Sequence, residues 1–243
     1  MPDERSEKER LRGEGFGKTF SKKWWDNFWY YYKKTVLIGI CALLVIGFSV
    51  YEAATKVHPD TIVNYVGFHN FSDEQLLNMK AYFGKISSDA NGDKKVQALL
   101  NRSAFDPSKA ETDQSVSNQL ETINLNLTVG DQVIYLMDKT CFDLFAGQKN
   151  DYFMDIRQLA KEYGIPDDKI VSSKGNTVGI DLTNSGMLKA CKIDLPPDTK
   201  KQDNGVYMVI RKRRNIEKSD KAKAAIYDNN LNMAKKILAT VEK

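Results

Sequence analysis

An uncharged run of 17 residues, Thr35 to Tyr51, constrains this 243-residue chain more than any other feature of its sequence. A helix rises about 1.5 Å per residue, so the run covers roughly 25 Å. Membrane-spanning helices begin at about 17 apolar residues. We therefore predict a transmembrane helix over residues 35–54, which divides the chain into a tail of residues 1–34 and a C-terminal domain of residues 55–243.

The residues that precede the run are typical of a membrane anchor rather than of a buried core helix. Lys33 and Lys34 stand at its start, where lysine side chains can reach the membrane surface. Aromatic rings prefer the headgroup level, and six of them lie just before the lysines. They are Trp24, Trp25, Trp29, Tyr30, Tyr31 and Tyr32. We expect this aromatic and basic collar to position the helix in the lipid bilayer.

Charge predicts the orientation of the anchor. Five lysines and one acidic residue, Asp26, lie between residues 18 and 34, whereas the charges that follow the run are nearly balanced. The positive-inside rule places the N-terminus in the cytoplasm and residues 55–243 outside the cell membrane. A cleaved signal peptide is the alternative. It is disfavoured because 34 residues precede the run and because Tyr51 and Glu52 stand where small residues are needed for cleavage.

The tail and the domain differ in composition. Residues 1–21 are rich in charge, glycine and serine, a composition that cannot bury enough apolar surface to fold. Beyond residue 54, strand-like and helix-like segments alternate, which predicts an α/β domain with a mostly parallel sheet. We expect strands at 62–66, 96–100, 133–137, 178–182 and 206–210. We expect helices from a Ser72–Gln75 capping box to Ile86, and over 116–127, 156–163 and 219–241.

Motifs for catalysis, metal binding and cofactor binding are lacking in the sequence. There is no Cys-x-x-Cys, Gly-x-Ser-x-Gly or His-Glu-x-x-His, and His58 and His69 are the only histidines. We therefore expect no enzymatic activity, no catalytic residue and no cofactor. The balanced charge of the domain gives no reason to expect a nucleic acid partner. Asp89 to Asp93 resembles the start of a calcium loop, but Lys94 replaces the required glycine. We interpret it as a polar turn and expect no metal site.

Two other features leave alternatives open. Cys141 and Cys191 would lie outside the cytoplasm, where a disulfide can persist, or they are two separate buried thiols. Pairing requires Cα atoms within about 7 Å. The basic run from Arg211 to Arg214 is interpreted as a solvated loop balanced by Glu217 and Asp220, and the alternative is contact with an anionic polymer or lipid headgroup.

Several stretches together resemble a family. They are the collar Phe28-Trp29-Tyr30-Tyr31-Tyr32-Lys33, the turn Asp89-Ala-Asn-Gly-Asp-Lys-Lys-Val, the segment Gly130-Asp131-Gln-Val-Ile-Tyr-Leu, and Phe145 to Leu159. In these the chain is similar to small single-pass surface proteins of clostridia-like Gram-positive bacteria, which are mostly uncharacterised. The resemblance implies an outer domain like a reduced type II periplasmic, solute-binding fold. About 185 residues provide one full lobe and a reduced second one.

In open α/β sheets, ligands bind beyond the carboxyl ends of the strands. Here those ends predict a ligand-binding set made of Gly67, His69, Asp138, Lys139 and Thr140. The alternative is that these residues only form turns. The first functional hypothesis is an extracytoplasmic interaction or structural module that contacts an envelope protein. The second is a tethered binding protein for a small extracellular solute or peptide.

Overall fold

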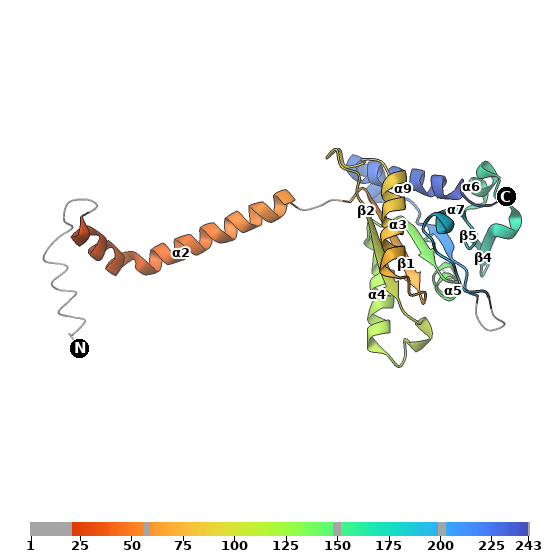
Figure 1. The fold of residues 1–243 in the computed structure, drawn as a ribbon, viewed down its shortest axis with the longest axis horizontal. Coiled ribbons are helices and arrows are strands. Elements are labelled where there is room, and N and C mark those ends of the chain that lie inside the picture. The colour runs from red at the N-terminus through yellow and green to blue at the C-terminus, as the bar shows by residue number, and fades with distance from the viewer. Residues whose placement is uncertain (1–20, 56–58, 148–151, 199–202, 243) are drawn as a thin grey trace. The chain divides into compact units, whose positions relative to one another are not determined.

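The computed structural model describes residues 21–55, 59–147, 152–198 and 203–242, in two compact units, residues 1–57 and 58–243. The first unit contains α2 (Lys22–Thr55). The second contains the sheet and the other helices (Figure 1). The tail of residues 1–20 and His58 lie outside the described residues.

The aromatic collar and the apolar run belong to one helix rather than to two segments that meet at residue 34. Helix α2 continues through both, and its segment Phe28–Glu52 is long and apolar enough to cross a membrane. By length and composition it suits either a membrane anchor or a signal sequence. Within the collar, Phe28 stacks on Trp24 and Tyr32, with ring centroids 5.1 and 5.4 Å apart. These rings therefore form a ridge along one side of the helix.

A six-stranded sheet organises the second unit, in the order β2-β1-β3-β6-β5-β4. Its strands are β1 (Thr61–Gly67), β2 (Ala98–Ala104), β3 (Ile134–Met137), β4 (Ile170–Ser173), β5 (Asn176–Asp181) and β6 (Tyr207–Ile210). Among the described strands, the β1–β2 and β1–β3 pairs are parallel, and the other three pairs are antiparallel. The expectation of a mostly parallel sheet is therefore wrong, although the mixed α/β class is confirmed.

The antiparallel half arises because the chain crosses from β5 to β6 without returning to the opposite edge of the sheet. Asp181, at the end of β5, pairs with Tyr207, the first residue of β6. Among its described residues, 182–198 and 203–206, the connection contains one short helix, α7 (Gly186–Ala190), which does not return the chain along the sheet. Both strand ends therefore lie at the same edge, and β6 runs back between β5 and β3.

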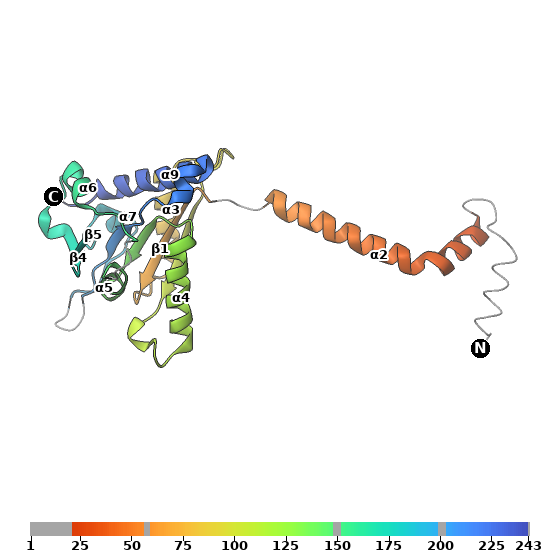
Figure 2. The same cartoon turned by 180° about the vertical axis from the view of Figure 1, so that it is seen from behind.

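Helices cover both faces of the sheet, which makes three layers (Figures 1 and 2). The first core cluster packs the sheet against α3 (Asp73–Ile86), α6 (Arg157–Tyr163), α7 and α9 (Lys221–Leu238). The second packs the other face against α4 (Gln114–Val129) and α5 (Lys139–Ala146). Along β3, Leu136 belongs to the first cluster, and Tyr135 and Met137 belong to the second. This alternation is the period of two that strands impose. Short helical turns η1 (Pro107–Lys109) and η2 (Asp167–Lys169) precede α4 and β4.

Most predicted elements are present, with shifted bounds. The Ser72 capping box is confirmed, since the Gln75 N–H donates to Ser72 Oγ over 3.2 Å and Gln75 Oε1 accepts from the Ser72 N–H over 2.9 Å. The second strand was expected at 96–100 but begins at Ala98. The terminal helix was expected at 219–241, whereas α9 covers Lys221–Leu238 and a separate short helix, α8 (Asn215–Ser219), ends just before it. Asp220 caps α9, because its carboxylate accepts from the Ala222 N–H over 2.9 Å.

Candidate functional site

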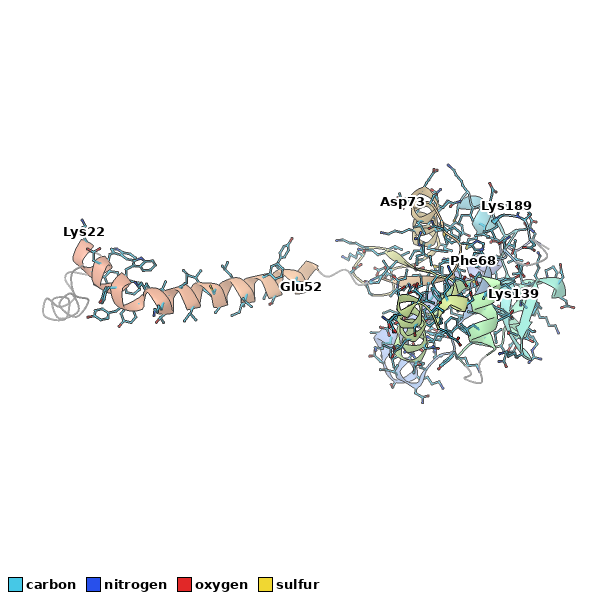
Figure 3. The ribbon with its side chains drawn as sticks, turned by 90° about the horizontal axis from the view of Figure 1, so that it is seen from below. Lys22, Glu52, Phe68, Asp73, Lys139 and Lys189 are labelled. Atoms are coloured by element: carbon cyan, nitrogen blue, oxygen red, sulfur yellow. The ribbon has the colours of Figure 1, made fainter. Side chains whose placement is uncertain are left out.

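The predicted ligand residues lie where β1 and β3 end side by side. The two strands are parallel neighbours, with Val66 paired to Met137, so Gly67 and Asp138 leave the sheet at the same edge. Figure 3 labels Phe68 and Lys139, which follow these strands. Asp138 is fully buried and is the N-cap of α5. The sequence therefore correctly placed these two strand ends together.

Both oxygens of the Asp138 carboxylate accept hydrogen bonds that hold that edge together. Its Oδ1 accepts from the Cys141 N–H over 2.7 Å and its Oδ2 from the Phe68 N–H over 2.6 Å. Burial raises the pKa of Asp138, and these hydrogen bonds offset part of the rise. Gly67 allows the close approach, since a Cβ there would lie 2.5 Å from Asp138 Oδ2. The pair therefore acts as a structural joint between β1 and α5.

His69 is buried beside this joint. The backbone N–H of His69 donates to the Tyr65 hydroxyl over 2.9 Å. The centroid of its ring lies 4.4 Å from that of the Phe68 ring. Burial lowers the pKa of His69, and the Asp138 charge and the carbonyls of residues 204 and 205 oppose that change. Burial therefore favours the neutral form of the imidazole. Its Nε2 has no hydrogen-bond partner among the described residues.

The other two predicted residues extend from the first turn of α5. Lys139 Nζ lies 2.9 Å from Asp143 Oδ1, and it stands 5.3 Å from the Phe142 ring and 5.8 Å from the Tyr207 ring. Thr140 is exposed. The structure thus brings Gly67, His69 and Asp138 together, whereas Lys139 pairs with its own helix.

Two further segments reach the same edge, and the sequence interpretation missed them. The Tyr207 hydroxyl donates to Asp203 Oδ2 over 2.6 Å, and burial raises the pKa of Tyr207. After β5, Asp181 accepts from the Thr183 N–H over 2.8 Å and lies 3.3 Å from Lys169 Nζ. These residues were missed because β6 was treated as another parallel strand, which would place its start at the opposite edge. The Asp203-Asn204-Gly205 turn before an apolar run was the signal available.

The Asp89 loop is closed by its own backbone. Asp89 accepts from the Gly92 and Lys94 N–H groups over 2.7 and 2.9 Å. The buried Asp60 carboxylate also holds this loop, because it accepts from the N–H groups of Ala90 and Gln97 over 2.7 and 2.8 Å. These oxygens therefore serve a polar turn. Among the described residues there is no group of three or more His, Cys, Asp or Glu that could hold a metal ion.

The cysteines of the domain are separate thiols. Cys141 and Cys191 are both buried and free. Cys141 belongs to the second core cluster and Cys191 to the first, on opposite faces of the sheet. The alternative of a disulfide between them is therefore not realised in this structure. Burial raises the pKa of the Cys191 thiol to about 11, which makes it a poor nucleophile.

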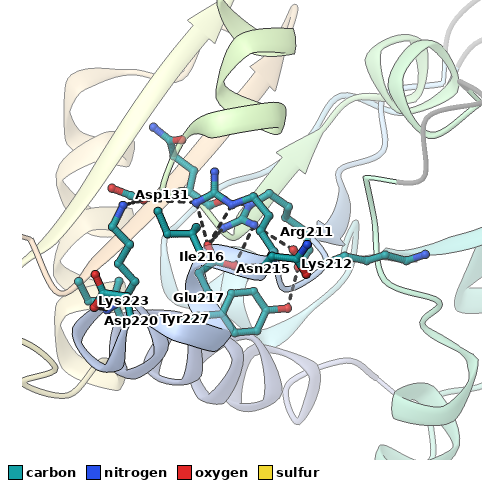
Figure 4. Close-up of polar contacts among 12 residues, drawn as sticks. Asp131, Arg211, Lys212, Asn215, Ile216, Glu217, Asp220, Lys223 and Tyr227 are labelled. Atoms are coloured by element: carbon teal, nitrogen blue, oxygen red, sulfur yellow. Dashed lines mark hydrogen bonds and ion pairs between the residues drawn. The ribbon is translucent and has the colours of Figure 1, made fainter.

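The basic run after β6 is not simply a solvated loop, which corrects the sequence interpretation. Arg211 is 1% exposed and forms an ion pair with the equally buried Glu217 (Figure 4). Arg214 Nη2 lies 2.9 Å from the same carboxylate and 3.4 Å from Asp131. Burial alone would raise the pKa of Glu217, but hydrogen bonds from Arg211 and Arg214 hold that pKa below its usual value. The expected balance by Glu217 is present, and it is formed in the interior.

An apolar groove lies on another surface, between α3 and β2. Its volume is about 340 Å³. Strand β2 is an outer strand of the sheet, since the strand order begins with it. Leu77 on α3 is 66% exposed and Leu99 on β2 is 41% exposed. The groove is lined by Asp73, Leu76, Leu77, Lys80, Leu100 and Arg102. Sequence reasoning did not find this surface because the order of the strands cannot be read from hydrophobic periodicity.

Comparisons with protein-family models, curated proteins and solved structures give no match to this chain. The resemblance to clostridial surface proteins therefore stays a prediction.

Proposed function

We propose that this chain is a single-pass membrane protein whose C-terminal domain lies outside the cytoplasm and binds another polypeptide at the α3–β2 edge. The observation that carries this proposal is the apolar groove beside an outer strand. Leu77 stands two-thirds exposed on α3, and an outer strand presents backbone N–H and C=O groups that another chain can pair with. Exposed apolar side chains grouped on a surface are typical of interaction sites.

The anchor supports the membrane part of this proposal. Segment Phe28–Glu52 has the length and apolar composition of a membrane span. Five lysines precede the apolar run between residues 18 and 34, which favours a cytoplasmic N-terminus. The lipid bilayer is then the first partner of the chain, and the domain binds its second partner at the outer face. The periplasmic-binding-like character of the domain belongs to this proposal as well.

The strand-end site favours polypeptide binding over solute binding as the main role. Asp138 uses both carboxylate oxygens on backbone N–H groups, and Lys139 pairs with Asp143. A solute would therefore have to compete with existing contacts for two of the five predicted residues. By contrast, Leu77 already lies exposed to solvent.

The test is site-specific photocrosslinking of the full chain in intact cells. A benzophenone amino acid placed at Leu77 or Leu99 should give a discrete polypeptide adduct, which becomes weaker when Leu100→Asp introduces a charge into the groove. The matched control position is Leu125, which is 58% exposed on α4. Absence of adducts from both edge positions, or equal adducts from Leu125, would contradict the proposal.

A small extracellular solute is the second candidate, and one observation favours it. His69 Nε2 is buried without a partner among the described residues, and a buried polar atom without a partner is costly. Ligand at about 100 times Kd should stabilise the domain by roughly 2.7 kcal/mol. A thermal-shift screen of the full chain in detergent against amino acids, short peptides and sugars tests this, with His69→Phe as the variant that should lose the shift.

A further inference from the structure

The outer edge of β2, which pairs with no other strand in the part of the chain that the structure describes, is regular along its whole length. All seven residues pair in register with β1, and the strand contains no proline and no bulge. The Gln97 carbonyl accepts from the Asp60 N–H over 2.9 Å, and the Phe105 N–H donates to the Gly67 carbonyl over 3.0 Å. Residues at odd positions therefore direct their backbone groups toward β1. Because the direction alternates along a strand, Ala98, Leu100, Arg102 and Ala104 direct theirs outward.

Proteins commonly protect such an edge with charged side chains. Here Arg102 is the one charged residue within β2. Its guanidinium turns back onto its own domain, where Nη1 donates to the Phe71 carbonyl over 3.1 Å. Arg102 is therefore held by its own chain and does not block the approach of another strand.

A second copy of β2 fits this edge in an antiparallel register centred on Asn101. When the twofold axis passes through Asn101, Leu100 lies opposite Arg102 of the second copy, and Ala98 lies opposite Ala104. All four of these residues direct their backbone groups outward, so they form the hydrogen-bonded pairs of an antiparallel ladder. Asn101 then faces Asn101 of the second copy as a non-hydrogen-bonded pair. No two positive charges are placed opposite each other.

The groove shows charge complementarity under the same symmetry. Its lining on α3 runs from Asp73 to Lys80, and its lining on β2 comprises Leu100 and Arg102. Leu77 is therefore close to the level of Asn101. A twofold axis there brings the exposed Leu77 side chains of the two copies together. It also places Asp73 of one copy toward Lys80 of the other, and both residues are exposed.

From this arrangement we infer that the polypeptide bound at the α3–β2 edge is a second copy of this chain. Two domains join through their β2 strands into one continuous sheet of twelve strands, with Leu77 packed on Leu77 across the axis. This inference rests on the proposed function, because it identifies the partner of the same surface.

Cysteine crosslinking of the full chain in its membrane tests the register. In a Cys41→Ser background, Asn101→Cys should form a disulfide-linked dimer under mild oxidation, because the Cα atoms of a non-hydrogen-bonded pair lie about 4.5 Å apart. Leu99→Cys should not crosslink, because four residues separate the two copies along the strands, about 13 Å. The double variant Leu99→Cys/Ser103→Cys should restore the dimer. Leu125→Cys is the control for random collision.

The outcomes separate this inference from the proposed function. Asn101→Cys that crosslinks no better than Leu125→Cys overturns the second copy as partner. If the benzophenone at Leu77 still gives an adduct of another mass, the proposed function survives. If the benzophenone at Leu77 gives no adduct at all, both this inference and the proposed function are contradicted. Light scattering of the unmodified chain in detergent gives a measurement that does not depend on cysteine variants: two copies are expected, Leu77→Glu should give one, and a single copy for the unmodified chain overturns the inference.

Discussion

Arg211 and Glu217 form an ion pair inside the domain, with side chains that are 1% and 3% exposed. The Arg211 Nε donates to the Gln132 carbonyl over 2.7 Å, and the Tyr227 hydroxyl donates to the Arg211 carbonyl over 2.8 Å. The pair therefore connects the end of β6 to the start of β3 and to α9. Such a pair stabilises a protein little more than well-packed apolar residues would. Removal of one partner, however, leaves a buried charge without its counterion.

Glu217→Gln should therefore destabilise the domain by about 3–5 kcal/mol. Calorimetric unfolding of the full chain in detergent measures the change. Asp155→Asn is the matched control, since Asp155 pairs with Arg157 at an exposed site and such pairs contribute about 0–1 kcal/mol. Equal effects of the two substitutions would show that the buried pair does not depend on both partners.

Gly67→Ala should destabilise the protein by about 1–3 kcal/mol, because overpacking at a tight site has that cost. The new Cβ would lie 2.5 Å from Asp138 Oδ2 and 2.8 Å from the Tyr65 hydroxyl. Gly84→Ala is the control within α3, where a Cβ meets nothing within 4 Å and alanine favours the helix by up to about 1 kcal/mol. Thermal unfolding followed by circular dichroism should separate the two variants in opposite directions.

The stability of the domain should fall in acid partly because of His69. Its pKa is lower in the folded state, so its contribution is present above the unfolded pKa of about 6.5 and is lost as the pH falls through the folded value. Asp138, whose pKa is raised, makes the opposite contribution to the pH dependence of stability, and it does so equally in the unmodified chain and in a His69 variant. His69→Phe should therefore show a smaller decrease in Tm between pH 7.5 and 5.0 than the unmodified chain. Parallel curves would contradict the assignment.

Asp138→Ala should cost more than loss of an ordinary N-cap. Its two oxygens accept from the Phe68 and Cys141 N–H groups over 2.6 and 2.7 Å, so we expect about 2–4 kcal/mol. Asp113→Ala removes the exposed N-cap of α4 and should cost about 1 kcal/mol. Urea unfolding of the full chain, followed by circular dichroism, compares the two.

The membrane anchor can be tested by charge and by mass. Leu43→Arg places a charge in the middle of the apolar segment. This raises the free energy of membrane insertion by about 2.5–3.5 kcal/mol and should reduce the membrane-bound fraction. Leu125→Arg, on α4, should leave that fraction unchanged. The mature chain should keep its N-terminal residues, and a C-terminal tag should be accessible to protease on intact cells. A mature chain that begins near residue 55 would instead identify a signal peptide.

Local sequence signals predicted the elements well and their arrangement less well. Neighbouring residues alone are enough to predict the Ser72 capping box and the buried 133–137 strand. The direction of β6 depends on the edge of the sheet to which the connection containing α7 leads. No local sequence pattern encodes that edge. Helix α5 was missed because Asp138 was interpreted as a ligand rather than as an N-cap. Arg211 was placed in solvent because a run of four basic residues does not reveal that one of them meets Glu217 in the interior.

The position of β1 determines how the domain would respond to a pulling force applied at Pro59. The chain enters the domain at Pro59 and passes directly into β1, which lies between β2 and β3 and is parallel to both. A pull at Pro59 that is directed along β1 acts across the direction of its ladder hydrogen bonds. Both ladders then bear the load in shear, rather than opening one bond at a time. The chain therefore enters the domain through a strand that is hydrogen-bonded to a neighbour on both sides.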